Sequence, residues 1–126
     1  MAKLKHILLE MATINEKSDI LSTDKYKIQI FGDDRTPMTP HYHFLANDNS
    51  FHIEIAINPK DELKIVHAKH RTNLDKSKWL TWEGLRKEKE LLEKWLDESN
   101  QVHPSDSNYE AIIFNWNYNN FSNKIK

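Results

Sequence analysis

The chain of 126 residues contains no cysteine and only two glycines. The absence of cysteine excludes disulfides and thiolate metal sites. Two glycines are too few to build the glycine-rich loops that bind phosphates or dinucleotides, which excludes the commonest nucleotide-binding folds. We therefore expect a protein that works without a cofactor.

Neither sign of charge is in excess: 18 basic residues stand against 19 acidic ones, giving a formal net charge of -1. No global field would attract nucleic acid or an anionic membrane. The sequence also lacks a hydrophobic run long enough for a membrane span or a signal peptide. These absences predict a soluble, cytoplasmic protein with a single domain over residues 1–126, without contact with a membrane.

Two neighbouring runs, residues 41–44 and 51–55, alternate polar and apolar side chains, as expected for strands with one apolar face. A two-residue turn at Asp48-Asn49 would join them into a hairpin, because both residue types tolerate positive φ. The hydrophobic pattern then sets the register, with apolar residues opposite one another and His43 opposite Glu54. The polar face, which we expect to be exposed to solvent, carries four notable side chains: His41, His43, His52 and Glu54.

Periodicity elsewhere predicts an N-terminal helix in residues 1–21, an antiparallel meander of about four strands in residues 25–70, and two C-terminal helices in residues 79–121. Thr81 is the expected N-cap of the first C-terminal helix, and residues 107–110 form a capping box for the second. Because the strands have one apolar face, the helices should pack on it, which defines an α+β fold. The expected core comprises Tyr26, Ile28, Ile30, Tyr42, Phe44, Ile53, Ile55, Leu85, Leu92 and Trp116.

The four polar residues of the hairpin allow two interpretations. His41 and His43 present their rings to the same side of a strand, and with His52 and Glu54 they could hold zinc, manganese or iron. In a metal-dependent hydrolase or nuclease, a histidine oriented by Glu54 would act as general base. The competing interpretation is a metal-free face whose histidines form hydrogen bonds or contact a partner. We favour the second, because the spacing is not an obligatory ligand pattern, and we assign no catalytic residue.

A basic stretch formed by Lys69, His70 and Arg71 is a weak candidate for binding nucleic acid. Trp79 and Trp82 follow it in the sequence, and aromatic rings beside basic residues can stack on bases. The tryptophans are more simply explained as anchors of the following helix in the core. We therefore do not expect a nucleic-acid site.

Three short motifs resemble those of an uncharacterised bacterial family of unknown function: Pro40-His41-Tyr42-His43, Ile53-Glu54-Ile55 and Leu92-Glu93-Lys94-Trp95. They occur in the family's order, which is a Pro-Pro-His-x-His strand, an Ile-rich strand, a further strand and a helix ending in Leu-x-x-x-Trp. The chain departs from the pattern at Thr39, where the family has the first proline, and in its added terminal helices.

The resemblance covers a little over half of the chain and implies the same fold, with His41 and His43 as functional positions. It also implies a protein partner, in a toxin–antitoxin-like or phage-related setting. Together with the absence of cofactor motifs, it favours a small protein-interaction module. Such a module would bind a protein partner or a second copy, and the unpaired edge of a short meander offers strand pairing for this purpose.

Overall fold

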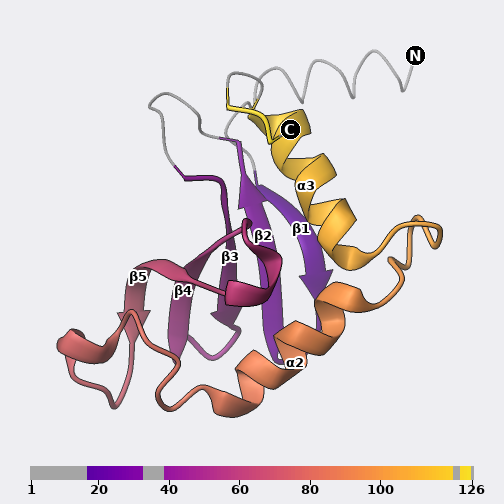
Figure 1. Ribbon diagram of the computed structural model, residues 1–126. Coiled ribbons are helices and arrows are strands. Elements are labelled where there is room, and N and C mark those ends of the chain that lie inside the picture. Colours follow the sequence, from indigo (N-terminus) through magenta and orange to yellow (C-terminus); the bar gives the residue numbers. More distant parts are fainter. Residues whose placement is uncertain (1–16, 33–38, 121–122, 126) are drawn as a thin grey trace, which may run out of the picture.

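The computed structural model describes residues 17–32, 39–120 and 123–125 (Figure 1). Within these residues a five-stranded antiparallel sheet is followed by two α-helices, which confirms the predicted α+β class with one strand more than expected. Every strand pairs with the next in sequence, so the sheet is a simple meander. The elements are β1 (Lys17–Ser22), β2 (Tyr26–Phe31), β3 (His41–Ala46), β4 (Phe51–Ala56), η1 (Lys60–Glu62), β5 (Ile65–Arg71), η2 (Lys76–Lys78), α2 (Arg86–Asp97) and α3 (Asn108–Asn119).

The hairpin of β3 and β4 has the predicted register, with Tyr42 opposite Ile55 and His43 opposite Glu54. Its connection is longer than expected, because β3 ends at Ala46 and β4 begins at Phe51, which leaves four residues between them. Only Asn49 in this connection has a positive φ, 65°. The register therefore follows from the hydrophobic pattern, which a longer turn leaves unchanged.

The additional strand is β1, and it corrects the predicted helix over residues 1–21, of which residues 1–16 lie outside the described residues. Ser18 and Asp19 are weak helix formers, because their side chains compete for backbone hydrogen bonds. As a strand, this segment satisfies the backbone groups along the edge of β2, which a helix could not do. The pairing is interrupted by a bulge between Asp19 and Leu21.

The predicted start of the first C-terminal helix is also wrong, because α2 begins at Arg86 and Thr81 lies in a preceding turn. Gly84 explains the delay: its φ of 79° belongs to the left-handed region that side chains disfavour and that ends regular structure. The capping box of α3 is confirmed, since the Ser107 side chain accepts from the backbone N–H of Glu110 and the Glu110 carboxylate accepts from the backbone N–H of Ser107.

The core lies between the sheet and the two helices (Figure 1). Nine of the ten predicted core residues are buried, and the tenth, Tyr26, is partly buried against the same cluster. From the helices, Leu92 and Leu96 of α2 and Ile112 and Trp116 of α3 complete it. Among the described helices, none is long and apolar enough to cross a membrane.

Candidate functional site

The face of the sheet opposite the apolar core gathers five of the seven histidines of the sequence. Alternation along β3 and β4 places the first four polar residues there, and β5 adds two more because His67 pairs with Glu54 and His70 pairs with His52. We call this set the histidine face; it consists of His41, His43, His52, Glu54, His67 and His70.

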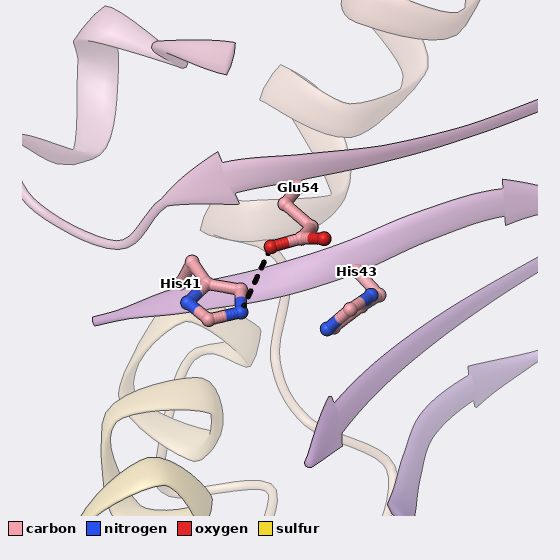
Figure 2. Close-up of side chains that lie close together, drawn as sticks. All are labelled: His41, His43 and Glu54. Carbon is pink, nitrogen blue, oxygen red and sulfur yellow. Dashed lines mark ion pairs between the residues drawn. The ribbon is translucent and has the colours of Figure 1, made fainter. Parts of the chain in front are cut away.

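Within the histidine face, His41, His43 and Glu54 each offer one ligand atom, and these three atoms lie within 4.8 Å of one another. Figure 2 shows the two rings and the carboxylate on the same side of two neighbouring strands. The closest approach joins His41 Nε2 and Glu54 Oε1 at 3.2 Å. The side chains of His41 and Glu54 are only 12% and 14% exposed, so this triad is largely shielded from water while keeping a path to it.

The hydrogen bond of the other ring nitrogen fixes the orientation of His41. Its Nδ1 lies 2.9 Å from the backbone oxygen of Thr39, and a carbonyl oxygen can only accept, so Nδ1 carries a hydrogen. In the neutral ring, Nε2 then presents a lone pair toward the carboxylate of Glu54. Two acceptors at this distance require a proton or a cation between them.

His43 is buried, with 3% of its surface exposed, which corrects the expectation that this face is open to solvent throughout. The ring of Phe31 stacks on it at a centroid distance of 4.1 Å. Burial, together with nearby His41, His52 and Lys69, lowers the pKa of His43 to about 3, so its ring is neutral at physiological pH. A neutral imidazole is the form that coordinates metal ions.

The remaining histidines form a second layer behind the triad. His43 Nδ1 lies 2.8 Å from His52 Nε2, which leaves Nε2 of His43 for the triad. Burial, with a contribution from Lys69, lowers the pKa of His52 to about 4. His67 Nδ1 donates to the second oxygen of Glu54 at 2.9 Å, and Nε2 of His70 is buried without a hydrogen-bond partner in the described part of the chain.

The structure brings together the four residues that the sequence nominated as a binding or metal site, but it gives them different positions. His41, His43 and Glu54 converge, whereas His52 stands behind His43 as its hydrogen-bond partner. This is the relation that ligands and their orienting partners have in metal sites.

The weak nucleic-acid candidates, Lys69, His70 and Arg71, do not form a common basic surface. Arg71 is buried and donates to backbone carbonyls of the segment that precedes α2, so it is not presented to a phosphate. The indole nitrogens of Trp79 and Trp82 donate to the carbonyls of Leu74 and Leu63, and Trp82 packs against the core.

Two contributors to the site were not anticipated from the sequence. Thr39 acts through its backbone oxygen, for which a side-chain pattern gives no signal. Phe31 directly follows the core residue Ile30 in β2, so alternation along the strand places its ring on the histidine face. An aromatic residue at a polar position was therefore the available signal.

No protein-family model, no curated protein and no solved structure matches this chain. The resemblance to an uncharacterised bacterial family therefore stays a prediction, and the histidine face is the basis for any functional conclusion.

Proposed function

We propose that the protein binds a divalent transition-metal ion through Nε2 of His41, Nε2 of His43 and a carboxylate oxygen of Glu54. The observation that supports this is the convergence of three donor atoms within 4.8 Å, two of which face each other as acceptors. A cation between them relieves that repulsion. Histidine nitrogens with one carboxylate are typical ligands of zinc and of non-haem iron.

The triad needs only a small closure to hold an ion. Bonds of about 2.1 Å in a tetrahedral site place ligand atoms roughly 3.4 Å apart, so no separation in the triad would have to shrink by more than about 1.4 Å. The surrounding contacts orient the three ligands. Thr39 holds the tautomer of His41, His52 accepts from the far side of His43, and His67 holds the other oxygen of Glu54.

Three protein ligands leave at least one coordination position for water or a substrate, which is the arrangement of hydrolytic metal centres. A bound ion of this kind lowers the pKa of its water and supplies a hydroxide near neutral pH. We therefore propose metal-dependent hydrolysis as the reaction class, in which the chain's own residues position the ion and keep the site largely shielded.

The alternative for the triad is a metal-free ion pair in which a proton on His41 Nε2 bonds to Glu54. Elemental analysis after dialysis against zinc, and titration with cobalt(II) followed by its visible spectrum, separate the two. We expect one equivalent of metal per chain. Glu54→Gln and His41→Gln should each weaken binding by more than about tenfold, because each removes one of only three ligands. His103→Gln, which changes an exposed histidine outside the histidine face, should bind as the wild type does.

Metal-free protein after dialysis, or unchanged affinity in Glu54→Gln, would leave the ion pair as the correct description. Circular dichroism of each variant verifies that the sheet remains folded.

A second candidate function, a protein-interaction module, is favoured by apolar side chains at the surface. Phe114 and Tyr118 on α3 are 66% and 62% exposed, and Val102 is 77% exposed. Val102 and Phe114 line one groove of about 430 Å³ with Ile20 of β1. Large apolar groups gathered at a groove are typical of contact surfaces. A toxin–antitoxin-like or phage-related role for such a module stays a prediction of the family resemblance.

A further inference from the structure

Lys69 is the basic side chain that reaches over the histidine face from β5. The pairing of β5 with β4 skips it, because Ala68 pairs with Ile53 and His70 pairs with His52. Its ammonium nitrogen nevertheless lies 5.8 Å from the centroid of the Phe31 ring, on the far side of β3 and β4. Because Phe31 stacks on His43, this positive charge stands above the strands that carry the triad.

The charge of Lys69 is not neutralised within the described residues. It has no carboxylate partner there, and the acid of the histidine face, Glu54, is already engaged by His41 and His67. The ammonium contributes to the lowered pKa of both His43 and His52, after burial as the largest cause. The lysine is exposed, so its side chain can turn toward the triad without leaving a packed position.

With a divalent ion bound, the site has an excess of positive charge. One carboxylate neutralises half of the charge of the ion, the two neutral histidines neutralise none of it, and Lys69 adds to the excess. In a site largely shielded from water such charges act strongly on a ligand. An anionic oxygen ligand restores the balance, and a group with several oxygens can contact the ion and the ammonium together.

We propose that the open position of the metal centre takes an oxyanion group, a phosphate ester or a carboxylate, and that Lys69 binds a second oxygen of that group. This inference rests on the proposed metal site. It defines the substrate class as anionic and makes Lys69 a residue that touches the substrate, with one oxygen on the metal ion and another accepting from the lysine Nζ.

The test uses cobalt(II)-loaded protein titrated separately with inorganic phosphate and with acetate, and reads the visible spectrum of the ion together with the heat of binding. Binding of phosphate alone would assign a phosphate ester, and binding of acetate alone a carboxylate. Lys69→Met should weaken the binding of the oxyanion by about tenfold, because it removes one charge-assisted hydrogen bond, and should not weaken the binding of cobalt, because it removes a positive charge near the ion.

Lys76→Met is a matched control, since Lys76 is also an exposed lysine whose nitrogen lies 5.8 Å from an aromatic ring, that of Trp79. It should bind oxyanions as the wild type does. Loaded protein that binds neither anion, equal binding without cobalt, or wild-type affinity in Lys69→Met would each overturn the inference while leaving the metal site intact. Protein that fails to bind cobalt would instead refute the proposed function, and the inference with it.

Discussion

The burial of His43 in the histidine face should make the folded protein less stable in acid. His43 is enclosed by Phe31, His41 and His52, so protonation would place a charge where little water can reach it. Its pKa falls to about 3 for this reason, while an unfolded histidine titrates near ~6.5. At a pH between these two pKa values, His43 is protonated in the unfolded chain and neutral in the folded chain.

The free energy of unfolding of the metal-free protein should therefore fall as pH drops below about 6.5, and this loss should continue toward pH 3. Above pH 6.5 His43 has no such effect, because it is neutral in both states. From pH 7 to pH 5 we expect His43 to account for a loss of roughly 1–2 kcal/mol, measured by urea denaturation, which His43→Gln removes while the loss due to His52 remains. His103→Gln should retain the wild-type slope, because that histidine is exposed. Equal slopes in wild type and His43→Gln would contradict the buried neutral state.

The residues of the candidate site were predictable from the sequence, but their environments were not. Strict alternation along β3 and β4 placed His41, His43 and Glu54 on one face, and the apolar pattern set their register. The burial of His43 depends on Phe31, which lies on a strand that the sequence did not align with the hairpin. A pattern of period two assigns a face, whereas burial depends on what other elements bring to that face.

Among the elements, the segment between β5 and α2 contains only one short 3₁₀ turn of regular structure, and a single side chain binds four of its backbone oxygens. The guanidinium of Arg71 donates to the backbone oxygens of Lys78, Trp79 and Thr81 at 3.2, 3.0 and 2.7 Å, and also to that of Glu83. Arg71 is only 7% exposed. Its fork of donors thus replaces the hydrogen bonds that a helix or sheet would give this backbone.

Replacing Arg71 with methionine should destabilise the protein by about 2–4 kcal/mol, because the backbone oxygens of Trp79, Thr81 and Glu83 lose this donor together. Arg71→Lys should recover only part of this, since an ammonium lacks the planar fork. Urea denaturation gives the stability, and hydrogen exchange should show faster exchange in residues 72–85. Arg86→Met, at an exposed position in α2, is the control and should change stability by less than about 0.5 kcal/mol. A similarly small effect of Arg71→Met would show that this segment keeps its conformation without the hydrogen bonds of Arg71.

Local signals predicted α3 well and the start of α2 poorly. The capping box is complete within four residues, so the sequence alone specifies where α3 begins. Thr81 has the side chain of an N-cap, yet Gly84 and the carbonyl contacts of Arg71 keep the chain in turns up to Leu85. In the same way β1 is a strand because β2 has a free edge beside it. Tertiary partners override propensity at both places.

For the molecule as a whole, strand addition is a poor route to association. Both outer strands carry irregularities: β1 has a bulge between Asp19 and Leu21, and the pairing of β5 with β4 shifts at two places. Bulges twist an edge away from a flat partner and protect it against pairing. The expectation that a sheet edge recruits a partner therefore finds no support, and the outer side of α3 becomes the candidate surface for an interaction.

We expect a second copy of the chain to bind there. Phe114 and Tyr118 lie one helical turn apart with their rings stacked at a centroid distance of 6.4 Å, and together they form an apolar ridge. The same ridge on two copies is self-complementary around a two-fold axis. A net charge of only -1 leaves little repulsion between copies.

Light scattering coupled to size exclusion should then give a mass above 15.0 kDa that rises with loading, up to concentrations of a few hundred micromolar. Phe114→Gln should return the protein to the mass of one chain, because the ridge loses its central apolar group. Leu80→Gln changes a leucine that is 57% exposed outside α3, so it should associate like the wild type. A wild-type protein that stays at the mass of one chain at every concentration would exclude self-association through this ridge. Metal content measured on the same fractions would show whether the histidine face is loaded independently of association.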